Sequence, residues 1–178
     1  MTTTIINKSS AARIALIDAV AIGIACLIPT LSHLTALPLY RLNPMMLVLL
    51  GGMLAVGDRR NAMLLAVLLP TVSMLAVGMP TPAKALCMVA EMLTLVSVAT
   101  WLERTWSRTA DSHGLSWKRF AATTGTTLCA MLCGKIVYYG LKALLLPSVA
   151  LVGTPLVTQA LTMVAAAGLY ALILNRKR

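Results

Sequence analysis

The chain has 178 residues, of which 59% are hydrophobic and only 11% carry a charge. A soluble domain carries about 25% charged residues, so this composition excludes a soluble globular protein and indicates one that crosses a membrane several times. At about 20 residues for each spanning helix, the chain has room for about five to seven spans and for no separate soluble domain. Long apolar runs favour helices over a barrel, whose strands alternate polar and apolar residues. We therefore expect residues 1–178 to form one all-α integral membrane domain.

Proline, glycine and charged turns divide the apolar sequence into six predicted helices. Pro29 ends the first apolar run, and Asn43 followed by Pro44 is typical of a capped helix start. The segment Gly57–Asn61 is a charged turn, and Pro147 ends the fifth run. The predicted helices cover about residues 10–28, 44–56, 62–77, 82–102, 120–146 and 154–174.

Basic residues are distributed unevenly between the two ends of these helices. With six spans, the loops of one side contain only Arg41 and Lys84. The other side receives Lys8, Arg13, Arg59, Arg60, Arg104, Arg108, Lys118, Arg119, Arg176, Lys177 and Arg178. Because cytoplasmic loops are rich in Lys and Arg, we expect both termini in the cytoplasm and the protein in the plasma (inner) membrane. This distribution accounts for most of the net charge of +10 without a nucleic-acid partner.

Several charged residues are not explained by this topology. An acid inside an apolar helix is costly and has to be paired or functional. Glu91 lies seven residues, or about 10 Å, deeper in its helix than Lys84. Lys135 lies about 10 Å deeper than Lys142 in the fifth predicted helix. Glu91 and Lys135 are therefore expected at the same depth, with Lys84 and Lys142 together near the outer surface. Asp18 is expected to pair with Arg13 or with another helix.

These side chains are candidates for one outward-facing pocket. The predicted substrate-binding residues are Arg41, Lys84, Glu91, Lys135, Tyr139 and Lys142. Their excess of positive charge favours an anionic ligand, such as a carboxylate or a phosphate. The alternative is that Glu91 and Lys135 form a purely structural ion pair that holds two helices together.

Two further features concern partners and chemistry. Ala15 and Ala19 belong to a row of small residues that lets another helix approach closely, either inside the protein or in a partner subunit. The four cysteines lie in apolar runs and are expected to be buried thiols. The chain has no P-loop and no protease, esterase or kinase motif, so we predict no enzyme activity, no cofactor and no metal site.

The sequence from Leu37 to Glu91 resembles the substrate-binding S components of energy-coupling factor (ECF) vitamin transporters. The resemblance consists of LPLYRLNP at Leu37–Pro44, a short helix, a basic turn, a helix with a proline, then GMPTPAK and Glu91. Length, six helices and internal termini fit as well. The spacing of Ala15 and Ala19 looks like the AxxxA contact of that family with its membrane-embedded coupling subunit.

This resemblance implies a substrate-capture subunit. Two loops, here 29–43 and 78–82, would close over a vitamin-like ligand, for example a carboxylate such as pantothenate. The subunit would then dock on a coupling subunit driven by two ATPases and release the ligand inside the cell. Two other functions stay open, namely a membrane scaffold similar to the MreD cell-shape proteins and a small stand-alone transporter.

Overall fold

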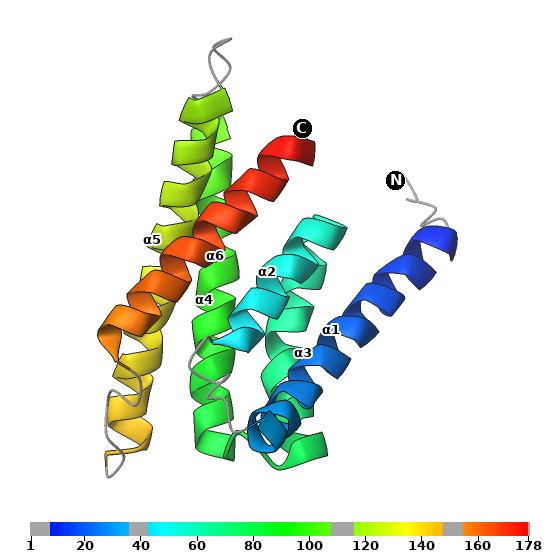
Figure 1. The fold of residues 1–178 in the computed structure, drawn as a ribbon, viewed down its shortest axis with the longest axis vertical. Helices are drawn as coiled ribbons and strands as arrows, with labels where there is room; N and C mark the ends of the chain where they lie inside the picture. The colour runs from blue at the N-terminus through cyan, green and yellow to red at the C-terminus, as the bar shows by residue number, and fades with distance from the viewer. Residues whose placement is uncertain (1–7, 36–42, 108–115, 148–154, 178) are drawn as a thin grey trace, which may run out of the picture.

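The computed structural model describes residues 8–35, 43–107, 116–147 and 155–177. These residues form six helices and contain no strand (Figure 1). The helices are α1 (Lys8–Thr35), α2 (Pro44–Val56), α3 (Arg59–Val77), α4 (Pro82–Ser107), α5 (Ser116–Leu145) and α6 (Leu156–Lys177). Five of them are long and apolar enough to cross a membrane, whereas α2 has only 13 residues. The predicted class, an all-helical multi-pass membrane protein, is confirmed.

Helix α1 continues through Pro29 to Thr35, so the prediction that Pro29 ends the first helix is wrong. Proline removes one backbone N–H from the helical ladder, which makes it a helix breaker in soluble proteins. Membrane helices tolerate proline, because neighbouring groups can satisfy the freed backbone carbonyl. Of the predicted loop 29–43, residues 36–42 lie outside the described residues, and Asn43 directly precedes α2.

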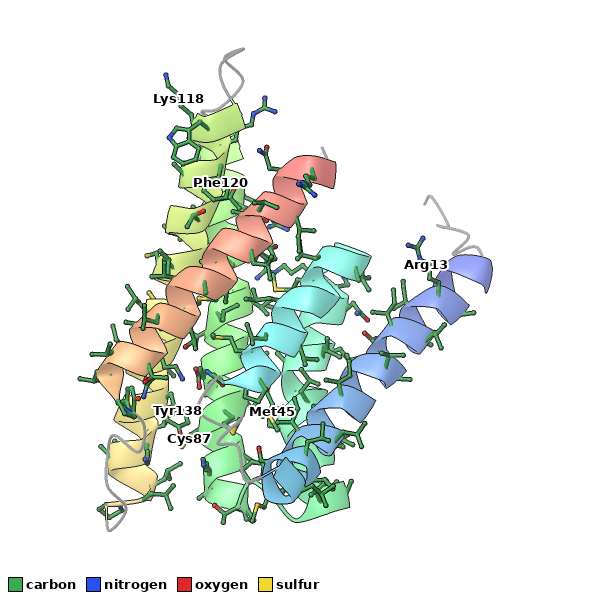
Figure 2. All side chains as sticks on the ribbon, viewed as in Figure 1. Arg13, Met45, Cys87, Lys118, Phe120 and Tyr138 are labelled. Atoms are coloured by element: carbon green, nitrogen blue, oxygen red, sulfur yellow. The ribbon has the colours of Figure 1, made fainter. Side chains whose placement is uncertain are left out.

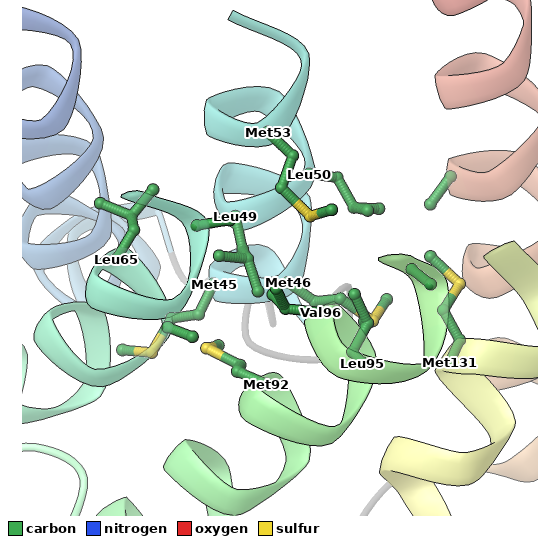
Figure 3. Packing of buried hydrophobic residues seen from close by; sticks show 14 of the residues in the cluster. Met45, Met46, Leu49, Leu50, Met53, Leu65, Met92, Leu95, Val96 and Met131 are labelled. Atoms are coloured by element: carbon green, nitrogen blue, oxygen red, sulfur yellow. The ribbon is translucent and has the colours of Figure 1, made fainter. Parts of the chain in front are cut away.

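The six helices pack side by side in a closed ring. Each helix packs on the next in the order α1, α3, α4, α5, α6, α2, and α2 in turn packs on α1. Helix α2 also packs on α3. The most extensive contact joins the antiparallel helices α4 and α5. The short helix α2 reaches the centre of the core, where Leu49, Leu65 and Leu95 are each 0% exposed (Figure 3). The bundle thus has an apolar centre to which α2, α3 and α4 all contribute.

The two ends of the bundle differ in charge. Both termini, the turn between α2 and α3, the end of α4 and the start of α5 lie at the same end (Figure 1). Arg13 and Lys118 lie at this end (Figure 2). The opposite end holds the end of α1 and the turn between α3 and α4. Arg13 and Lys118 therefore lie at the end of the bundle where the sequence predicted basic residues, while the side of the membrane that each end faces stays a prediction.

Asp18 is held by a neighbouring helix. Its Oδ1 accepts a hydrogen bond of 2.9 Å from Asn61 Nδ2 in α3. Of the two partners expected from the sequence, the structure therefore gives another helix. This contact pins α1 to α3 near the basic end of the bundle.

Candidate functional site

A cavity of about 610 Å³ lies in the half of the bundle opposite the termini. Its walls come from the end of α1, the start of α2, the α3–α4 turn, the first half of α4, the second half of α5 and the start of α6. Met45 and Tyr138, two of its lining residues, lie in this half of the molecule (Figure 2). Ligand pockets span about 300–1,000 Å³, so this cavity is large enough for a small organic molecule.

Five of the six predicted pocket residues line this one cavity. They are Lys84, Glu91, Lys135, Tyr139 and Lys142. The sixth, Arg41, lies outside the described residues. The structure thus brings together side chains that are up to 58 residues apart in the chain, and their role in binding stays a prediction.

Glu91 and Lys135 form an ion pair in the cavity wall. Lys135 Nζ lies 2.7 Å from Glu91 Oε1, and the two side chains are only 16% and 6% exposed. Their equal depth, expected from helix spacing, is confirmed. The pair joins α4 to α5, and both of its residues also line the cavity. It is therefore compatible with the ligand-binding role and with the purely structural role that the sequence left open. The ammonium group of Lys135 additionally lies 5.2 Å from the centroid of the Tyr138 ring, within range of a cation–π interaction.

Gly134 explains why α4 and α5 approach so closely at this pair. A Cβ atom at position 134 would lie 2.9 Å from the backbone oxygen of Glu91. Real Cβ atoms essentially never come that near to a backbone oxygen, so a side chain here would push the helices apart. The missing side chain of Gly134 therefore sets the helix separation that allows Lys135 to reach Glu91.

Asn43 contributes a third group to this cluster, and the sequence analysis missed it. Asn43 stands at the N-cap position of α2 with left-handed backbone geometry (φ 49°), but its side chain makes no capping bond to the helix. Its Nδ2 instead donates to Glu91 Oε1 at 3.3 Å. A carboxylate is a stronger acceptor than a neutral group. The Asn-Pro pattern indicated a cap and gave no sign of this contact with α4.

The remaining polar residues of the site lie nearer to the end of the bundle. Lys142 is 7% exposed, whereas Lys84 is exposed. Tyr139 donates from its hydroxyl to Gln159 Oε1 in α6 at 2.7 Å, which ties α5 to α6 across the cavity wall. Gln159 was not among the predicted site residues, since a single glutamine near a helix start carries no particular signal.

Methionine side chains form much of the apolar wall. They are Met45, Met46, Met79, Met88 and Met163. Methionine is unbranched and polarizable, and it adapts to irregular shapes. Sequence reasoning could not find these residues, because methionine is equally common in a plain core.

The turn between α3 and α4 closes one edge of the cavity. Met79, Pro80 and Thr81 line the cavity, and Gly78 ends α3 with a φ of 73° that favours glycine. Ser73, which is 0% exposed, donates from Oγ to the backbone oxygen of Met79 at 2.9 Å. This partly buried bond links the turn to α3. Movement of residues 78–82 as a lid stays a prediction.

Substitution Ser73→Ala is expected to lower the free energy of unfolding by about 1–3 kcal/mol, because the carbonyl of Met79 loses its buried donor. Thermal unfolding in detergent measures the effect. Thr94→Ala is the matched control, since the Thr94 hydroxyl donates to the Ala90 carbonyl of its own helix. Equal losses in both variants would show that the turn does not depend on Ser73.

Ala15 and Ala19 are exposed on α1 and are not part of the cavity wall. Of the cysteines, Cys87 is buried, but Cys129 is exposed, so the expectation of a buried thiol is wrong there. An apolar run does not distinguish the core of a membrane protein from its lipid-facing surface, because lipid tails are as apolar as leucine. Within the described residues, no group of three or more His, Cys, Asp or Glu side chains is placed to hold a metal ion.

Comparison with known proteins found no matching family model and no match among curated proteins or solved structures. The cavity and the residues that line it are therefore the features that point to a function.

Proposed function

We propose that the protein is a membrane-embedded subunit that captures a small anionic organic solute for uptake. The observation that supports this best is the charge of the cavity. Three lysines and one glutamate are among its described lining residues, which gives a net charge of +2 (three minus one). Charged side chains at membrane depth are costly and mark binding or transport paths. A small anion is the ligand that this charge favours.

The ion pair alone does not explain the charged residues. Glu91 and Lys135 neutralise each other and stabilise the contact of α4 with α5. Lys84 and Lys142 play no part in that pair, yet both line the same cavity. A scaffold protein has no need to gather two further cations around a cavity of this volume, whereas a capture protein for an anion does.

The proposed setting follows the resemblance to the ECF S components. The cavity end would face outward, because the opposite end carries the basic clusters that favour the cytoplasm. Since no P-loop occurs in the chain, energy for uptake would come from a coupling subunit and its two ATPases. The exposed positions of Ala15 and Ala19 on α1 support docking through that helix.

The ligand-binding proposal is tested by Lys84→Gln. Loss of one charged contact at an exposed site is expected to weaken binding of a carboxylate ligand about tenfold, or about 1.4 kcal/mol. Calorimetry on the purified protein with a panel of carboxylate- and phosphate-bearing vitamins measures it. Lys118→Gln is the matched control, because Lys118 lies at the other end of the bundle (Figure 2). Equal affinity of both variants and wild type would contradict the proposal.

The docking proposal is tested separately by Ala15→Leu with Ala19→Leu. Bulky side chains on the small row are expected to lower uptake by cells at least about tenfold, since close helix approach needs small residues. Ligand binding by the purified variant should be unchanged, because neither alanine lines the cavity. Ala165→Leu, at an exposed position of α6, is the control. Unchanged uptake in the double variant would favour a stand-alone transporter.

A further inference from the structure

We infer that the ligand of this cavity is bipolar, with an anionic group near Lys84 and Lys142 and a hydrogen-bond donor about 10 Å away at Glu91. This inference rests on the proposed function and adds the polarity and length of the solute. It excludes compact anions and dianions with a negative charge at each end.

The register of α4 against α5 places Lys84 and Lys142 together at one end of the cavity, which is called its cationic end. The contact of Glu91 with Lys135 fixes which residues of the two antiparallel helices face each other. Lys84 lies seven residues before Glu91 on α4, and Lys142 lies seven residues after Lys135 on α5. Each lysine is therefore about 10 Å from the ion pair along its helix axis. Both lie toward the same end of the bundle and both line the cavity. The anionic group of the ligand is therefore placed there.

The Glu91 carboxylate provides a hydrogen-bond acceptor at the other end of the cavity, which is called its acceptor end. Within the described residues, Lys135 Nζ and Asn43 Nδ2 both contact Oε1, and no group donates to Oε2. The Glu91 side chain as a whole is only 6% exposed, but its Oε2 atom is not fully enclosed by protein. Since Glu91 lines the cavity, we place this remaining acceptor within reach of a bound ligand. A carboxylate oxygen in such a place favours a hydroxyl, amide or amine donor from a ligand.

The wall between these two ends is mostly apolar. Met88 stands between Lys84 and Glu91 on α4, and Met46 and Met163 approach from α2 and α6. Ser32 from α1 also lines the cavity, and its Oγ is buried without a hydrogen-bond partner in the described part of the chain. An unbonded buried hydroxyl is costly, so Ser32 can bond a further polar group of the ligand.

The charge arrangement decides between ligand classes. A compact anion, such as inorganic phosphate, reaches the lysines but leaves Oε2 of Glu91 without a donor. A dicarboxylate of full length brings a second negative charge against Glu91. A hydroxy acid or an amide-bearing acid satisfies both ends, because it carries the anion and the donor on one extended molecule.

The test uses three sets of linear probes with the purified full-length protein: ω-hydroxycarboxylates, plain monocarboxylates and α,ω-dicarboxylates, each in increasing length. Calorimetry and thermal stabilisation measure binding. We expect the hydroxy acid whose ends are about 10 Å apart to bind at least about tenfold more tightly than the monocarboxylate and the dicarboxylate of equal length. Shorter and longer hydroxy acids should lose this advantage.

A double variant, Glu91→Met with Lys135→Met, removes the acceptor at this end of the cavity, because a thioether accepts hydrogen bonds only weakly. It leaves the net charge of the lining residues unchanged, so the ratio of the affinities for a hydroxy acid and a monocarboxylate of equal length, both measured on this variant, reports on the contact at Glu91 alone. The preference for the hydroxy acid should fall below about threefold. If the double variant does not fold, the length dependence in the wild-type protein alone decides.

The outcomes separate this inference from the proposed function. Equal binding of hydroxy acids and monocarboxylates at every length would overturn the bipolar ligand and leave anion capture standing. A tighter dicarboxylate would overturn the role of Glu91 as acceptor. Dissociation constants weaker than about 1 mM for all three sets would overturn both the inference and the proposed capture of organic anions.

Discussion

Replacing Lys135 with alanine is expected to lower the free energy of unfolding by about 3–5 kcal/mol, because the buried carboxylate of Glu91 loses its counter-charge. This ion pair joins α4 to α5 at 2.7 Å through two largely buried side chains. Asn43 donates to the same carboxylate oxygen, but a neutral amide cannot replace the charge. Thermal unfolding of the purified protein in detergent measures the loss.

A second variant separates the structural from the functional role of this pair. Lys135→Met with Glu91→Met replaces both charges by apolar side chains of similar volume, an exchange that is often neutral or stabilising by about 1–4 kcal/mol. We expect this variant to be at least as stable as wild type and to lose the preference for ligands that carry a hydrogen-bond donor opposite their anionic group. Lys118→Ala, at an exposed position in the other half of the bundle, is the control. Wild-type stability of Lys135→Ala would show that Glu91 is well solvated.

Gly134→Ala is the second substitution with a large expected effect. The added Cβ would lie 2.9 Å from the backbone oxygen of Glu91 and 3.4 Å from its Cγ, so α5 has to move away from α4. Overpacking of this kind costs about 1–3 kcal/mol. Because the same movement draws Lys135 away from Glu91, ligand affinity should fall together with stability.

Gly140→Ala provides the matched control for that prediction. Gly140 lies in the same helix, and a Cβ atom there would have no heavy atom within 4 Å. Alanine is the better helix former by about 0.5–1 kcal/mol, so this control should be slightly stabilised and should bind normally. A Gly134→Ala variant that behaves like Gly140→Ala would contradict the close approach of α4 and α5.

The bounds of α2 were predictable because local chemistry sets both of its ends. Pro44 starts the helix at a position that needs no backbone donor, and Gly57 ends it with a φ of 73°. The end of α1 was not predictable in the same way. Pro29 carries the same local signal as a helix end, but the helix continues for six more residues to Thr35.

The charged part of the site was predictable, because charges are rare in apolar helices and helix spacing gives their depth. This reasoning placed Glu91 level with Lys135, as the ion pair confirms. It could not provide the groups that depend on the packing of distant helices. Asn43 meets Glu91 across 48 residues of sequence, and the fit of Gly134 against Glu91 exists only after α4 and α5 are packed.

Native mass spectrometry of the gently purified protein tests the proposed capture of an anionic solute most directly. We expect wild type and Lys118→Gln to carry a small organic anion, added from the vitamin panel or retained from the cell. The variant with both Lys84→Gln and Lys142→Gln should lose it, because these two lysines supply the cationic end of the cavity. The same adduct in all three proteins, or wild-type protein that stays without ligand across the whole panel, would contradict anion capture by this cavity.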